Sequence, residues 1–264
     1  MNQAVYDTIG KEYNQNRRAD RRLVDRIGEL LNLPPGATIA DIGAGSGSGN
    51  YTNALADKSY KVLAVEPSAE MRGQARPHGN VTWHSGTAET LPLADASVDG
   101  VVIPLAIQHF ASLEDAALEM NRICPEGPVI VFTHEPRAAE DDWFADYFPE
   151  IHDHDFDVFP PIAELAGVLE GALARPATIH SFPLLRDFAD RNMRWGWGEP
   201  EFYLDAQARK NTSGFSLTDP AEVARGLKRL EADLASGEWD RRHGHLRTRA
   251  EFDAGFRLVK FGAT

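Results

Sequence analysis

A glycine-rich stretch and a nearby carboxylate are the residues in this sequence best suited to binding a ligand. The stretch is Asp41-Ile42-Gly43-Ala44-Gly45-Ser46-Gly47-Ser48-Gly49-Asn50, and it lies between a β-branched run and a segment of helical length. Glycines at such a turn let the backbone bend sharply and let a ligand approach with no Cβ in the way. Glu66 ends the next β-branched run, where a carboxylate accepts hydrogen bonds from ribose hydroxyls. These residues predict a site for a ligand with an unphosphorylated ribose.

The spacing of the glycines argues against two other nucleotide-binding loops. A dinucleotide fingerprint needs G-x-G-x-x-G, but its third position is Ser48 when counted from Gly43 and Asn50 when counted from Gly45. No Gly-Lys-Ser/Thr follows, which excludes a nucleoside-triphosphatase loop. A nicotinamide-dependent oxidoreductase on a similar sheet stays as an alternative that this spacing disfavours.

The surrounding sequence alternates between strand and helix patterns. Such alternation implies crossover connections and a mostly parallel sheet. We therefore predict an α/β fold with a Rossmann-like, doubly wound, mostly parallel seven-stranded sheet. The predicted strands are 38–42, 61–65, 81–84, 98–103, 129–132, 177–182 and 255–261.

The order of these patterns predicts a single domain over residues 1–264. Helical patterns at 1–36 indicate an N-terminal helical flap, and 37–185 carries the alternating core. A long, mostly helical segment at 186–250 stands before the final strand at 251–264. A helical segment in that position predicts a cap over the carboxyl edge of the sheet.

Composition limits the partners. The chain has 27 Lys and Arg against 40 Asp and Glu, a formal net charge of -13. Such a surface repels phosphate backbones and anionic lipid, so we expect no nucleic acid and no membrane partner.

The cysteine count and the absence of targeting patterns favour the cytoplasm. One cysteine, Cys124, allows no internal disulfide, and no signal peptide or apolar run of ~20 residues is present. We expect a small-molecule substrate, with a monomer or a homodimer both left open.

Several segments in a fixed order resemble the class I S-adenosylmethionine-dependent methyltransferases, particularly the ubiquinone/menaquinone-methyltransferase-like (type 11) group. The resemblance covers roughly residues 6–134 and returns in the last strand. It implies S-adenosyl-L-methionine as cofactor and methyl transfer to an O or N atom of a small-molecule metabolite. A protein that binds this cofactor without catalysis is the second alternative. The matching segments are 41–47, 64–68, 86–93, 97–102, 107–110 and 122–127.

The resemblance also implies which residues bind the cofactor. Gly43 and Gly45 are expected behind its methionine part, Asp41 near its amino group and Glu66 on its ribose. Thr87 stands where the family often has an acidic residue that meets the adenine, which leaves open a weaker affinity or a role for Glu89. The remaining expected cofactor residues are Pro67, Met71, Ala88, Pro104, Tyr13 and Arg17.

A smaller set of residues is a candidate for catalysis or for holding the substrate. His109 follows the fourth strand, at the edge where ligands bind, and is either a general base or a packed histidine. His134 follows the fifth strand and is an alternative. Tyr6 in the N-terminal segment, and Trp195 and Trp197 in the cap, either contact the substrate or pack structurally.

His152-Asp153-His154-Asp155 has side chains that bind metals. No H-E-x-x-H motif or cysteine set accompanies it. We expect a solvated acidic loop there and no metal.

Overall fold

The computed structural model of the protein describes residues 18–45, 51–191, 194–210 and 212–262. Seven strands form one sheet in the order β3-β2-β1-β4-β5-β9-β6, and neighbouring strands run parallel except where β9 pairs with β5 and β6. The predicted Rossmann-like, mostly parallel seven-stranded sheet is confirmed. Its strands are β1 (Thr38–Ile42), β2 (Lys61–Val65), β3 (Val81–His84), β4 (Gly100–Pro104), β5 (Val129–His134), β6 (Ala177–Ser181) and β9 (Phe256–Phe261).

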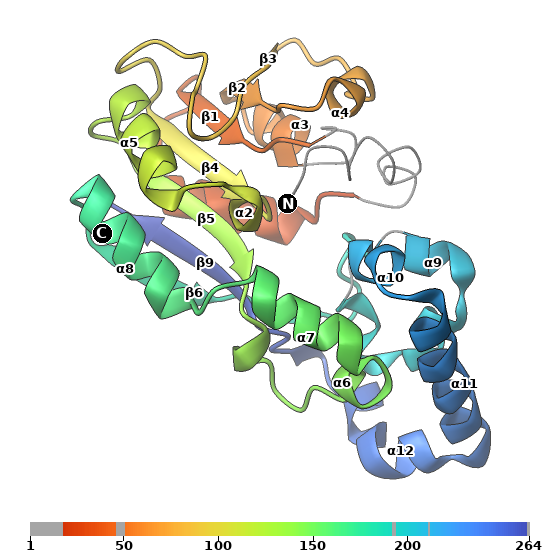
Figure 1. Ribbon diagram of the computed structural model, residues 1–264. Helices are drawn as coiled ribbons and strands as arrows, with labels where there is room; N and C mark the ends of the chain where they lie inside the picture. The colour runs from red at the N-terminus through yellow and green to blue at the C-terminus, as the bar shows by residue number, and fades with distance from the viewer. Residues whose placement is uncertain (1–17, 46–50, 192–193, 211, 263–264) are drawn as a thin grey trace.

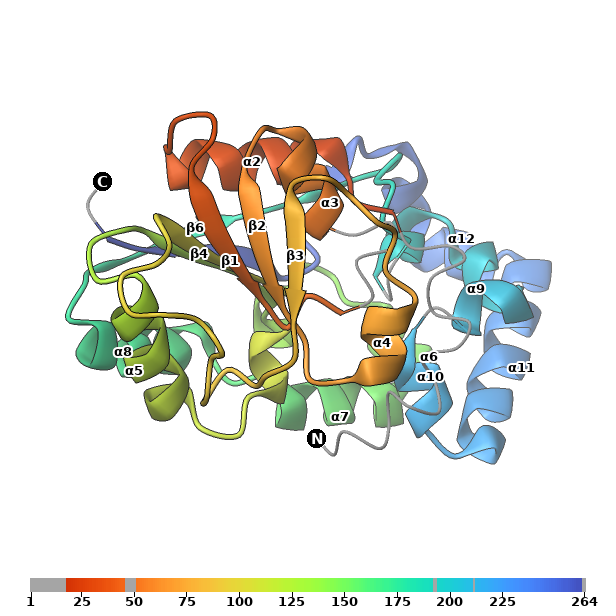
Figure 2. The same cartoon turned by 90° about the horizontal axis from the view of Figure 1, so that it is seen from above.

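Helices cover both faces of this sheet (Figure 2). The central strands are nearly all apolar because both of their faces are buried. Successive side chains point to opposite faces, so Val101 and Val131 pack in one apolar cluster while Val102 and Phe132 pack in the other. One layer contains α2 (Arg21–Leu31) and α3 (Tyr51–Asp57), and the other contains α5 (Leu113–Ile123) and α8 (Ile162–Leu173).

Local capping sets where the longer helices begin and end. The Asp20 carboxylate accepts from a backbone N–H at the start of α2, and Asn32 ends that helix in the left-handed region. Ser112 caps α5 in the same way. Asp219 caps α11 (Pro220–Ser236), which ends at Gly237 with a φ of 79°. These signals are local, which is why the sequence places the helices well.

The strand order reverses between β1 and β4, and ligands bind at such a reversal in open α/β sheets. The loop after β1 and the short helix η1 (Ile107–His109) after β4 both lie there. Gly43 adopts a φ of +74°, and a Cβ at this position would lie 2.5 Å from the Cβ of Ala106. Glycine at position 43 therefore allows the two loops to approach closely.

The cap is built from two parts of the chain, whereas the sequence suggested 186–250 alone. Residues 143–158 lie within the predicted core segment, yet α6 (Phe144–Tyr147) and α7 (Pro149–Val158) lie beside the late helices (Figure 1). Trp143 Nε1 donates to the carbonyl of Trp197 at 2.8 Å, and Tyr147 Oη donates to Asp233 Oδ2 at 2.8 Å. The later cap elements are η3 (Trp195–Gly198), η4 (Pro200–Leu204), α9 (Ala206–Lys210), α10 (Ser213–Leu217), α11, α12 (Glu238–His243) and η5 (Gly244–Thr248).

A two-stranded ribbon marks where the chain leaves the core and returns to it. In this ribbon β7 (Leu184–Leu185) pairs antiparallel with β8 (Glu251–Phe252). Residues 251–252 therefore belong to the ribbon, and the final sheet strand begins at Phe256. Within the described ranges, none of the helices combines the length and the apolar character needed to cross a membrane.

Candidate active site

A cavity of about 430 Å³ lies at the strand reversal and extends to the cap. Small-molecule sites typically have volumes of roughly 300–1,000 Å³. Most of the described residues that were predicted from the sequence as site residues line this cavity. They are Asp41, Gly43, Gly45, Glu66, Pro67, Met71, Thr87, Ala88, Glu89, Pro104, His109 and His134.

Glu66 holds the glycine loop in place at the end of β2. Its Oε2 accepts from the Gly45 N–H at 3.0 Å and its Oε1 accepts from the Ser68 N–H at 2.9 Å. Burial raises the pKa of the Glu66 carboxyl, and the backbone donors at Ser68 and Gly45 partly offset this. A carboxylate offers about four lone-pair sites, so each oxygen keeps one for a ligand hydroxyl.

Asp41 lines the same cavity, and one of its two carboxylate oxygens has no hydrogen-bond partner in the described part of the chain. Its Oδ2 accepts from the Thr52 hydroxyl at 2.6 Å, while its Oδ1 is buried and has no hydrogen-bond partner among the described residues. Burial raises the pKa of Asp41 to about 7, and the neighbouring charge of Glu66 adds to this. A positively charged donor would relieve both effects.

The turn after β3 forms a second wall near Met71 of α4 (Ala69–Gly73). In this turn the Thr90 N–H donates to the Thr87 carbonyl at 3.3 Å. The Glu89 Oε1 accepts from the backbone N–H groups of Ala111 at 2.7 Å and Ser112 at 3.4 Å. One oxygen of Glu89 is therefore committed to holding the start of α5, which leaves the other for a ligand.

Two histidines line the cavity, and burial keeps both neutral. It lowers the pKa of His109 to about 4 and that of His134 to about 3. Nε2 of His134 lies 2.8 Å from the Ala254 carbonyl, so a proton on this nitrogen makes it the donor of that bond. His109 lies on η1 beside Gln108, at the strand reversal.

The low pKa of His109 is expected to appear directly in an NMR titration. Its Cε1–H resonance should shift with a midpoint near pH 4 instead of the ordinary 6.5, because burial disfavours the imidazolium. Between pH 4 and 6.5 the His109 imidazole is protonated in the unfolded chain but neutral in the folded protein. The free energy of unfolding therefore decreases as the pH falls from about 6.5 towards 4. Assignment by His109→Gln identifies the resonance, and a midpoint near 6.5 would contradict the buried geometry.

The end of the cavity away from the glycine loop, called the far end below, contains polar residues that were not predicted as site residues from the sequence. Asp155 of α7 lines it together with Arg194 and Thr212. The run from His152 to Asp155 was expected to be a solvated loop, but it lies within α7, and Asp155 is only 4% exposed. Among the described residues, no three histidine, cysteine, aspartate or glutamate side chains are grouped so that they could hold a metal ion. The helical signals for α7 are Pro149 and Glu150 in its first turn.

Trp195 and Trp197 do not line the cavity, which favours structural packing, the second of the two roles considered for them. Trp195 Nε1 donates to the Phe188 carbonyl at 2.6 Å, and the Trp197 ring stacks on Phe252 at 5.3 Å between centroids. Both indoles therefore pack within the cap and its ribbon. Of the other nominated residues, Tyr6, Tyr13 and Arg17 lie outside the described residues, as do positions 46–50 of the glycine loop.

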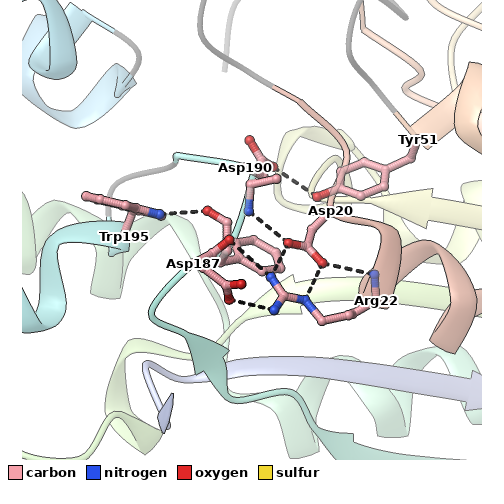
Figure 3. A network of polar contacts seen from close by, with 8 residues as sticks. Asp20, Arg22, Tyr51, Asp187, Asp190 and Trp195 are labelled. Atoms are coloured by element: carbon pink, nitrogen blue, oxygen red, sulfur yellow. Dashed lines mark hydrogen bonds and ion pairs between the residues drawn. The ribbon is translucent and has the colours of Figure 1, made fainter. Parts of the chain in front are cut away.

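A polar network attaches the start of the late cap segment to the core. Arg22 of α2 lies between Asp20 and Asp187, and the Asp20 Oδ2 also accepts from the Ala189 N–H at 2.8 Å (Figure 3). Tyr51, the first residue of α3, donates its hydroxyl to Asp190 Oδ2 at 2.9 Å. Since Tyr51 and Asp190 both line the cavity, this network joins the helix after the glycine loop to the cap.

Comparisons with known proteins agree with this geometry. A family model described as a methyltransferase domain matches residues 41–132. The chain is 43% identical over 94 residues to a ubiquinone/menaquinone biosynthesis C-methyltransferase of Rubrivivax gelatinosus, covering 35% of this chain and 37% of that protein. It is 32% identical over 131 residues to a malonyl-[acyl-carrier protein] O-methyltransferase of Enterobacter lignolyticus, covering 49% and 51%. The chain thus spans a third to a half of the length of these curated relatives.

A solved structure extends the similarity to nearly the whole chain. A protein of Anabaena variabilis, assigned as a methyltransferase from an antibiotic biosynthesis pathway, is 42% identical with a TM-score of 0.90. The match covers 94% of this chain and 100% of that protein, so it includes the cap as well as the sheet. With this likeness, the matching domain and the carboxylate-lined glycine loop together, the chain belongs to the class I S-adenosylmethionine-dependent methyltransferase family.

Proposed function

We propose that this protein binds S-adenosyl-L-methionine and transfers its methyl group to an O or N atom of a small molecule. The observation that carries the proposal is the pair of carboxylates beside the glycine loop. Glu66 keeps lone pairs for ribose hydroxyls, and the buried Oδ1 of Asp41 suits the ammonium of the methionine part. Two carboxylates at this loop would repel a diphosphate, which disfavours the nicotinamide dinucleotides.

The remaining nominated residues suit the rest of the cofactor. Gly45, with a φ of +60°, leaves open backbone for the methionine part. The turn at Thr87 and Ala88, with Met71 opposite, would hold the adenine, and Pro67 and Pro104 would complete the wall. Tyr13 and Arg17 stay candidates for the cofactor and Tyr6 for the substrate, on sequence grounds.

The residues of this chain mainly have to bind, orient and exclude water. When bound, S-adenosylmethionine supplies a methyl group on a positively charged sulfur with a neutral leaving group. Residues of the cap line the cavity and would keep the acceptor aligned, and such alignment supplies much of a rate enhancement. His109 is neutral at physiological pH and is our candidate for taking a proton from an acceptor that must lose one. His134 stays a candidate for contacting the substrate.

Charge and composition support the rest of the proposal. With a net charge of -13, a small molecule is a better acceptor than a nucleic acid. The single cysteine, Cys124, is buried, which suits a reducing cytoplasm. We leave monomer and homodimer as the two proposed assembly states.

Calorimetry followed by a transfer assay tests this function. We expect saturable binding of S-adenosylmethionine and S-adenosylhomocysteine and none of NAD(P). Labelled methyl transfer to members of a metabolite panel should follow. Binding of NAD(P) alone would favour the oxidoreductase, while tight cofactor binding with no transfer to any acceptor would favour the non-catalytic alternative.

A further inference from the structure

The far end of the cavity combines a buried carboxylate with an arginine that is already engaged. Arg194 is 4% exposed, and its side chain forms ion pairs with Asp142 at 2.7 Å and with Asp155 at 3.4 Å. Two carboxylates therefore share one guanidinium. Asp155 is the more distant of the two, and its side chain is only 6% exposed, so its charge is incompletely compensated.

The position of Asp155 on its helix increases its need for a donor. It lies in the last turn of α7, where the partial negative charge of the helix end disfavours a carboxylate. Burial raises the pKa of Asp155 to about 6, and the nearby Asp142 adds to this against the opposing charge of Arg194. A cation or a hydrogen-bond donor from the cavity would stabilise the charged form.

The Thr212 hydroxyl is a second polar group at this end of the cavity. Thr212 lines the cavity and is 4% exposed, and its Oγ1 is buried with no hydrogen-bond partner among the described residues. A buried hydroxyl without a partner costs free energy, which a polar ligand group would recover. The apolar side chains around this end of the cavity are Val158, Phe159, Leu217 and Phe256.

We propose that Asp155 and Thr212 form the recognition site for the methyl acceptor, and that the acceptor is a small apolar molecule with a neutral or cationic hydrogen-bond-donor head, an amine or a hydroxyl. This inference rests on the proposed function. Molecules with a carboxylate head bind more weakly, because Asp155 repels them and Arg194 already pairs with two carboxylates. Asp155 is then the residue that sets head-group specificity.

Three matched probes test the head-group preference directly. Benzylamine, benzyl alcohol and benzoate share one ring and differ in the head. Their affinities are measured by ligand-observed NMR with the protein saturated by S-adenosylhomocysteine. We expect benzylamine and benzyl alcohol to bind, and benzoate to bind at least about tenfold more weakly than benzylamine, as expected for one unfavourable charge contact in a buried site.

Asp155→Asn and Asp142→Asn form a matched pair of variants. Both remove one carboxylate from the same arginine, but Asp142 does not line the cavity. Asp155→Asn should lower the ratio of benzylamine to benzoate affinity about tenfold, whereas Asp142→Asn should change it less than about threefold. Thr212→Val disturbs no ion pair and should weaken the binding of benzyl alcohol about threefold. This variant tests the recognition site if Asp155→Asn does not fold.

The outcomes separate this inference from the proposed function. A protein that fails to bind S-adenosylhomocysteine contradicts the proposed function. Retained S-adenosylhomocysteine binding with benzoate preferred, or with none of the three probes bound, overturns the recognition site alone. Equal effects of Asp155→Asn and Asp142→Asn would also overturn it, because the effect would then come through Arg194.

Discussion

Glu66→Ala is expected to weaken the binding of S-adenosylmethionine by about 1.5–3 kcal/mol, which is roughly 10–150-fold in affinity. The substitution removes the acceptor for the ribose hydroxyls, and hydrogen bonds to a charged group are the stronger kind. It also releases the Gly45 N–H, which Glu66 holds at 3.0 Å, so the glycine loop loses part of its support. Both effects act on the cofactor-bound state, and isothermal titration calorimetry measures them.

A neighbouring glutamate gives the matched control for this variant. Glu70 lies on α4, is exposed, and contacts Gln74 instead of the cavity. Glu70→Ala should leave the affinity within about twofold, because an exposed pair on a helix surface contributes little. If Glu66→Ala kept its affinity while remaining folded, the ribose would have to lie elsewhere.

Gly226→Ala is expected to lower the free energy of unfolding by about 1–3 kcal/mol, although alanine favours helices. Gly226 is buried in α11, and a Cβ there would lie 2.2 Å from the carbonyl oxygen of Tyr147. This atom belongs to the backbone of α6, so it cannot rotate away. The two parts of the cap would have to separate, and α7, which carries Asp155, directly follows α6.

The same substitution in another helix should have the opposite sign. Gly171 is exposed in α8, and nothing lies within 4 Å of a Cβ built on it. Gly171→Ala should therefore raise the free energy of unfolding by about 0.5–1 kcal/mol through helix propensity alone. Urea unfolding of both variants measures the difference, and a stabilising Gly226→Ala would mean that the two parts of the cap are not in close contact.

The cofactor side of the cavity was largely predictable because its residues follow directly from strand ends. A β-branched run with a glycine loop places Asp41 and Gly45 at one edge of a parallel sheet, and the next strand brings Glu66 to the same edge. This holds whatever the remaining chain does. The structure was needed to show which backbone N–H groups donate to Glu66. It was also needed to show that one oxygen of Glu89 holds the start of α5.

The cap was less predictable because several of its contacts are long-range. The sequence has aromatic residues at 143–148, but it does not say that they pack against α11 and α12. For the same reason the sequence left Trp197 as a candidate pocket wall, while the structure buries it against Phe252. Periodicity identifies a face that must be covered and leaves its partner undefined.

Local signals in the sequence specify the sheet, its helical layers and the position of the glycine loop, because strand patterns, caps and crossover rules act over short distances. Long-range packing, in contrast, sets which polar residues meet at the far end of the cavity. Asp155, Arg194 and Thr212 come from three separate segments, and the packing of α7 against the late helices brings them to the same cavity. Their apposition depends on the burial of apolar surface elsewhere in the cap, which no local pattern in the chain encodes.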